Sequence, residues 1–140
     1  MEQVIYNGKI RGAFTGFDEN RIFVMANGSY WIQTRSTHWY HYAYRPNATI
    51  VKENGKHFLH VEGRSIPVRR VMCLAESQID GAFSGWDGNS RYRLKNGQLW
   101  EQTQYKYQYK YAYQPDVVVC DVGGQYMMQV DGTHAYVRQV

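Results

Sequence analysis

The chain has 140 residues, enough for one domain or two small ones, and it contains no apolar run that approaches the 18 or so residues of a membrane-spanning helix. Its aromatic content of 16%, supplied mostly by 13 Tyr, favours half-buried β-strands and excludes disordered and collagen-like chains. The first residues lack the apolar segment of a signal peptide, which predicts a soluble, cytoplasmic protein.

An internal duplication organises the sequence. Residues 10–71 align without a gap on residues 79–140, and about 23 of the 62 positions are identical. This predicts two repeats, residues 1–71 and 72–140. Units of this size bury a small share of their surface alone, so we expect the two copies to pack together.

Each copy predicts a series of short strands and no helix. A first strand ends at Phe17 in a turn, Asp18-Glu19-Asn20, in which the Asp side chain can accept hydrogen bonds from backbone N–H groups. The same turn recurs at Asp87. The further strands predicted in the first copy are residues 22–26, 29–34, an aromatic strand that ends at Pro46, residues 48–52, and a hairpin that turns at residues 62–63.

Asn-Gly pairs lie between the second and third strands, at residues 27–28 and 96–97. This pair is typical of a type I′ hairpin turn. A strict two-residue turn places Trp100 on the outer face beside Arg93, whereas a three-residue loop with a bulge pairs Trp100 with Tyr92. Both registers remain open.

The fourth strand of the second copy carries tyrosine at every second position. Tyrosines 105, 107, 109, 111 and 113 share one face, and Lys106, Gln108 and Lys110 share the other. We expect this tyrosine ladder to be structural, filling the barrel and the interface between the copies. Five tyrosines are hard to bury in a narrow barrel, so the alternative is that some of the ladder lines an open groove.

About six short antiparallel strands in some 65 residues, with Gly-rich corners, predict a small SH3-like or OB-like barrel. The expected fold is therefore all-β, with two tandem small antiparallel β-barrels, and a single fused sandwich is the alternative. The motif L-x-N-G-Q-x-W-x-Q at residues 94–102, followed by the tyrosine ladder, resembles a small all-β, SH3-like domain of uncharacterised bacterial proteins. That resemblance implies a fold and no activity.

Residue patterns typical of enzymes and metal sites are missing from the sequence. There is no G-x-S-x-G elbow, no phosphate-binding loop and no zinc-type ligand spacing, so we expect no catalytic residue, no cofactor and no metal. Cys73 and Cys120 replace Val4 and Val51 of the first copy, which predicts buried thiols rather than a disulfide.

Charge is divided unevenly between the copies. Residues 1–70 carry 10 Lys and Arg against 5 Asp and Glu, and residues 71–140 carry 6 against 7. An acidic partner would therefore prefer the first copy.

The face opposite the tyrosines supplies the candidate contact surface. Trp39, His41 and Arg45 project together from the first copy, and the full candidate set is Trp39, His41, Arg45, Arg35, Trp31, Trp100 and Lys110. A tryptophan beside cations can stack on a planar ligand. The sequence thus predicts a non-enzymatic module that binds a protein or peptide, or that forms a homodimer through tyrosine-rich strands. Weak binding of nucleic acid by the basic copy is the alternative, and no membrane contact is expected.

Overall fold

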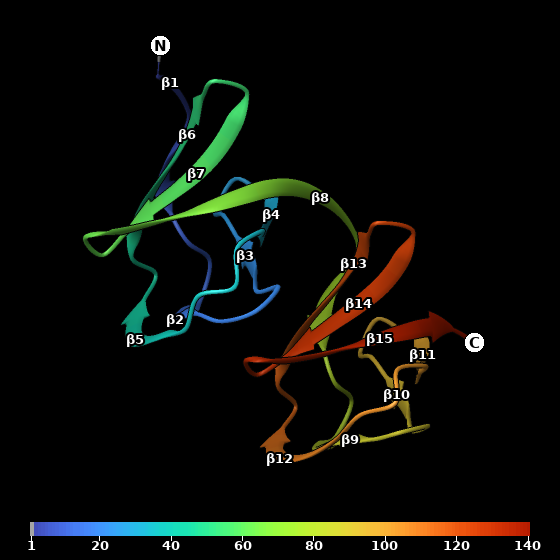
Figure 1. The fold of residues 1–140 in the computed structure, drawn as a ribbon. Helices are drawn as coiled ribbons and strands as arrows, with labels where there is room; N and C mark the ends of the chain where they lie inside the picture. The colour runs from blue at the N-terminus through green and yellow to red at the C-terminus, as the bar shows by residue number, and fades with distance from the viewer. Residues whose placement is uncertain (1) are drawn as a thin grey trace. The chain divides into compact units, whose positions relative to one another are not determined.

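A computed structural model describes residues 2–140 (Figure 1). All the secondary structure in this range is β-strand, and every paired strand is antiparallel, which confirms the all-β prediction. The described residues form no helix that is long and apolar enough to cross a membrane. The chain divides into two compact units, Met1–Val71 and Met72–Val140.

The first unit consists of one sheet and a separate two-stranded ribbon. The sheet has the strand order β1-β6-β7-β8-β4-β3, and β2 pairs only with β5 in the ribbon. The strands are β1 (Gln3–Lys9), β2 (Ala13–Phe17), β3 (Ile22–Val24), β4 (Tyr30–Gln33), β5 (Trp39–Tyr44), β6 (Asn47–Glu53), β7 (Lys56–Val61) and the first part of β8 (Arg64–Gln78).

The second unit repeats this plan. Its sheet has the order β8-β13-β14-β15-β11-β10, and its ribbon pairs β9 with β12. Strand β8 belongs to both sheets, because residues 64–71 pair with β7 and β4 and residues 72–78 pair with β13. The remaining strands are β9 (Ala82–Asp87), β10 (Arg91–Arg93), β11 (Leu99–Gln102), β12 (Tyr107–Tyr113), β13 (Asp116–Val122), β14 (Gln125–Val130) and β15 (Thr133–Gln139).

Neither sheet is closed into a barrel, so the predicted barrel closure is not found. The two ends of the first sheet meet at one isolated bridge, Ile10 with Met25, and Ile79 with Leu94 forms the corresponding bridge in the second unit. The chain bends directly after each bridge, at Gly12 and Gly81, and enters the ribbon instead of extending the ladder. A single residue pair does not make the continuous hydrogen-bonded ring that a barrel requires.

The Asn-Gly hairpins are three-residue loops and not type I′ turns. Only the glycine of each pair has a positive φ, 85° at Gly28 and 92° at Gly97. The Gly97 amide donates to the Leu94 carbonyl, which closes a four-residue turn that ends in the left-handed glycine, and the Leu94 amide donates to the Gln98 carbonyl across the three-residue loop. This geometry selects the register in which Tyr92 pairs with Trp100.

Aromatic side chains fill the core of each unit. Phe14, Phe23 and Trp31 are buried in the first core, and Phe83, Trp86 and Trp100 are buried in the second. Tyr92 also belongs to the second core, where its hydroxyl donates to the Gly85 carbonyl at 2.9 Å. Burial raises the pKa of Tyr92 to about 12, since the apolar surroundings disfavour the phenolate.

Cys73 and Cys120 form a disulfide, so the prediction of free buried thiols is wrong. The two residues lie directly opposite each other on the antiparallel strands β8 and β13, which brings the sulfur atoms together. The first unit has Val4 opposite Val51 at the same position of its sheet. The bond therefore replaces an apolar cross-strand pair.

Candidate binding surfaces

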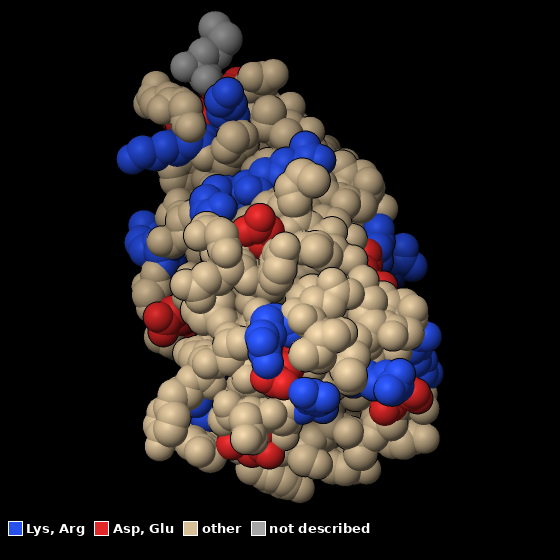
Figure 2. All heavy atoms as spheres, turned by 90° about the vertical axis from the view of Figure 1, so that its right-hand side faces the viewer, with Lys and Arg blue, Asp and Glu red and all other residues tan. Residues whose placement is uncertain are grey.

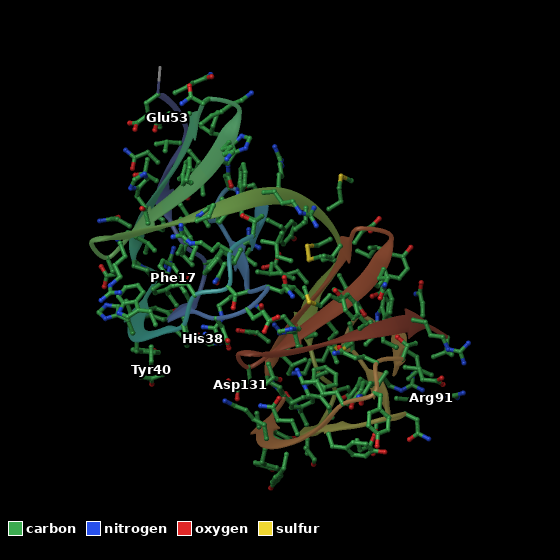
Figure 3. The ribbon with its side chains drawn as sticks, viewed as in Figure 1. Phe17, His38, Tyr40, Glu53, Arg91 and Asp131 are labelled. Atoms are coloured by element: carbon green, nitrogen blue, oxygen red, sulfur yellow. A yellow bond between two sulfur atoms is a disulfide. The ribbon has the colours of Figure 1, made fainter. Side chains whose placement is uncertain are left out.

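Tyrosine side chains form the most exposed aromatic surface of each unit. The tyrosines of the β12 row are 59 to 86% exposed, and those of the β5 row are 59 to 85% exposed. The β12 row consists of Tyr105, Tyr107, Tyr109, Tyr111 and Tyr113; the β5 row consists of Tyr40, Tyr42 and Tyr44. The prediction that the ladder fills the interior is wrong. In Figure 3 Tyr40 projects away from β5, whereas Phe17 points into the first unit.

A glycine lies opposite one tyrosine of each row. Tyr109 lies opposite Gly85 on β9, and Tyr40 lies opposite Gly16 on β2. Both glycines have φ near 100°, and a Cβ at either one would collide with the carbonyl oxygen of the paired strand. Glycine is therefore required at both positions, where the two strands of each ribbon approach closely. Other tyrosines of the β12 row have side chains opposite them, such as Asp87 opposite Tyr107.

The opposite face of β5 packs on the core and does not form an open platform. Trp39 and His41 share this face, as predicted, with ring centroids 4.8 Å apart and an interplanar angle of 10°. Trp39 is partly buried and contacts Phe14 and Phe17 of the first core. Its ring therefore serves packing, which corrects the prediction of a stacking platform.

The tryptophan that each ribbon contributes to its core lies on a different strand in the two units. Phe17 pairs with Trp39 across the first ribbon, and Trp86 pairs with Gln108 across the second. Trp86 occupies the position equivalent to Phe17, and Gln108 the position equivalent to Trp39. Each ribbon thus places one tryptophan over its core, from β5 in the first unit and from β9 in the second.

Polar groups on the adjacent hairpin hold this tryptophan in both units. The Arg64 guanidinium lies 4.6 Å from the centroid of the Trp39 ring, and His41 Nε2 lies 3.0 Å from Glu62 Oε1. In the second unit, at the position equivalent to Arg64, Thr133 accepts a hydrogen bond of 3.0 Å from the indole of Trp86. These polar contacts are therefore explained by the packing of the tryptophan in each unit.

Trp31 and Trp100 lie in the cores, 2% and 0% exposed, and neither can present its ring to a ligand. Their placement follows from the three-residue hairpin loops, which turn both indoles inward. Each indole N–H is satisfied nearby, by the Ser29 hydroxyl in the first unit and by the Gln98 amide oxygen in the second. Both residues are therefore removed from the candidate contact set.

The three predicted cationic residues lie on the surface at separate places. Arg45 is exposed at the end of β5 with φ of 48°, and its amide donates to the Gly12 carbonyl. Arg35 is exposed in the loop before β5. Lys110 Nζ lies 3.9 Å from Asp131 Oδ2 in the second unit. On the face drawn in Figure 2, basic and acidic side chains are interspersed.

Other surface features of the described residues are modest. One open groove of about 370 Å³ lies in the first unit, lined by residues 47–49 and 60–65, with His60 and Arg64 among them. No group of three His, Cys, Asp or Glu within residues 2–140 could hold a metal ion. Glu101 accepts from Arg91 and Arg138, and these hydrogen bonds lower its pKa. That cluster links three strands on the surface.

Gln33 and Gln102 have a role that the sequence analysis did not identify. Both are buried, and each side chain bonds backbone groups of the preceding turn and of the loop that leads into the tyrosine strand. Gln102 Oε1 accepts from the amides of Asp87 and Gly88, while its Nε2 donates to the carbonyls of Gln104 and Lys106. Glutamine occurs at the equivalent position of both copies, and this identity is the feature of the sequence that could have pointed to the role.

Comparison with known proteins adds no relative. No protein-family model, no curated protein and no solved structure matches the chain. The resemblance to the bacterial SH3-like domain receives no support from these comparisons, and the functional inference rests on the surfaces described above.

Proposed function

We propose that the chain is a non-enzymatic binding module whose contact surface for a protein or peptide is the β12 tyrosine row. The observation that carries this proposal is the exposure of the β12 row, in which all five rings are at least 59% open to solvent. Soluble proteins rarely leave contiguous aromatic surface exposed unless it binds something. Tyrosine is also enriched at protein interfaces, because its ring is apolar and its hydroxyl can bond at the rim.

A protein or peptide is the partner class that this surface fits best. Strand β12 pairs only with β9 among the described residues, so its second edge can accept an extended segment while the tyrosines contact alternate side chains. Seven residues of strand provide enough length for such pairing.

A peptide selection tests the proposal. Random peptides of 7 residues, the length of β12, are selected against the immobilised chain. We expect aromatic-rich peptides to be enriched and to lose binding to a triple variant with Tyr107→Thr, Tyr109→Thr and Tyr111→Thr. Threonine preserves strand propensity, and circular dichroism verifies the fold. The matched triple of the other row, Tyr40→Thr with Tyr42→Thr and Tyr44→Thr, controls for a general loss of tyrosine. Peptides that bind all forms equally would refute a role for the β12 row.

Nucleic acid is a second candidate for the first unit. Its three exposed tyrosines share one strand, and exposed Arg45 directly follows Tyr44, in the half of the chain that carries 10 basic against 5 acidic residues. Base stacking on aromatic rings together with phosphate contacts is the usual mode of single-strand binding.

Fluorescence anisotropy of labelled single-stranded and duplex oligonucleotides, from about 50 to 200 mM salt, tests this candidate. We expect the affinity to fall steeply with salt and to be lost in the β5 triple variant but retained in the β12 triple variant. If no binding is detected at the lowest salt, the nucleic-acid candidate is wrong, and the basic half is an ordinary solvated surface.

A further inference from the structure

The spacing of the β12 tyrosines leaves room for inserted rings. Side chains on one face of a strand recur every two residues, about 6.8 Å apart. That distance is close to twice the contact distance of about 3.5 Å between carbon atoms. A planar ring placed between two successive tyrosines would therefore touch both. The Tyr105 ring already contacts the Tyr107 ring edge-on, with centroids 5.2 Å apart, so the gap between these two rings is filled, whereas the rings of Tyr109, Tyr111 and Tyr113 are 59 to 73% exposed.

The β12 row is complementary to itself. Tyrosine recurs at each odd position from 105 to 113, so the row has the same pattern in both chain directions. A two-fold axis placed between neighbouring residues of β12 would set the rings of one copy between those of the other. Such isologous contacts are the commonest basis of protein dimers. A β-bulge between Tyr109 and Ala112 adds local twist, and Tyr111 and Tyr113 remain 59 and 68% exposed on its far side.

The exposed area is close to what a stable dimer needs. With about 200 Å² for a whole tyrosine side chain, the five exposed rings of the β12 row offer roughly 700 Å² per copy. A specific interface buries about 800 Å² per partner. The three tyrosines of β5 offer only about 400 Å² on the same basis, so the β12 row is the better candidate.

Charge also favours a second copy over nucleic acid at this row. The row itself carries no charged side chain, although the exposed carboxylate of Asp87 lies opposite Tyr107 at its edge. The two lysines of this segment lie on the other face and have partners, since Lys106 Nζ donates to the His134 carbonyl and Lys110 lies beside Asp131. Phosphate binding needs cations directed at the ligand, and the second half of the chain has 6 basic against 7 acidic residues.

We infer that the chain forms a two-fold symmetric dimer in which the β12 tyrosine rows of two copies interleave. This inference rests on the proposed function of the β12 tyrosine row and names a second copy of the chain as the partner of the β12 row.

Sedimentation velocity of the full chain, from about 1 µM to about 1 mM, tests the inference across affinities of micromolar to millimolar strength. We expect a shift from monomer to a species of twice its mass as the concentration rises. Salt at 0.5 M should leave this shift unchanged, although it is about five times the concentration that gives a Debye length of 10 Å. The β12 triple variant should raise the dissociation constant about 100-fold, because interface tyrosines are frequent hot spots. The β5 triple variant should leave the dissociation constant unchanged.

A monomer at all concentrations, or a dimer that the β12 triple variant leaves intact, would overturn the inference. The peptide selection separates this failure from failure of the proposed function. A monomeric chain that selects peptides through the β12 row is still a binding module, with a different partner, whereas a monomeric chain that selects none contradicts both. Saturable binding of an uncharged oligosaccharide by the monomeric chain, lost in the β12 triple variant, would also show that the row has another occupant.

Discussion

Removal of the Cys73–Cys120 disulfide is expected to lower the free energy of unfolding of the second unit by about 4 kcal/mol, because the bond closes a loop with a sequence separation of 47 residues. Without the bond, the unfolded chain regains that loop entropy. The expected result is earlier unfolding in urea when a thiol reductant is present. Hydrogen exchange read by mass spectrometry on peptides of residues 82–140 assigns the loss to the second unit.

A matched variant separates the bond from the packing of the two side chains. Cys73→Val with Cys120→Val installs the pair that the first unit already uses, Val4 opposite Val51. This variant should match the reduced protein and should not respond to reductant. Equal stability of the oxidised, reduced and valine forms would show that the bond contributes nothing. A disulfide persists more readily in an oxidising compartment than in the cytosol, so the cytoplasmic location stays a prediction that this measurement informs.

Trp39→Gln is expected to destabilise the first unit by about 2 kcal/mol, since a partly buried indole that contacts Phe14 and Phe17 is lost. Adding Phe17→Trp should restore most of the loss, because the double variant copies the Trp86–Gln108 pair of the second unit. Phe17→Trp alone should be destabilising through overpacking. Hydrogen exchange on peptides of residues 2–71 gives each free energy without relying on tryptophan fluorescence.

The coupling between the two substitutions is the decisive quantity. If the tryptophan has only moved from one strand to its neighbour, the double variant should lose less free energy of unfolding than the two single variants lose in sum. Additive losses would mean that Trp39 has a separate role, and a binding function for its face would then have to be reconsidered.

Much of the strand pattern could be predicted from the sequence, because period-two alternation and Gly-containing turns are local signals. Alternation correctly placed Trp39 and His41 on one face of β5 and the tyrosines on the other. It could not show which face meets the core, since both faces are aromatic and the outcome depends on Phe14 and Phe17 from a different strand. Strand β1 was also not predicted, because its residues lie outside the duplicated segment.

Other features depend on contacts between distant parts of the chain. The pairing of Cys73 with Cys120 follows from the register of β8 and β13, and Arg64 reaches Trp39 from a hairpin that no local pattern connects to β5. The hairpin register could not be predicted from the sequence, because Asn-Gly fits both loop lengths. The structure resolves it through the left-handed glycine at position 97.

Nitration of tyrosines with tetranitromethane, mapped by mass spectrometry, tests most directly whether the β12 row is the contact surface. We expect Tyr107, Tyr109 and Tyr111 to be nitrated readily in dilute protein and to become protected as the concentration rises. The β5 row should react equally at every concentration, and buried Tyr92 should react at none. If both rows keep the same reactivity from dilute to concentrated protein, the β12 tyrosines do not form the interface between copies, and the central claim is contradicted.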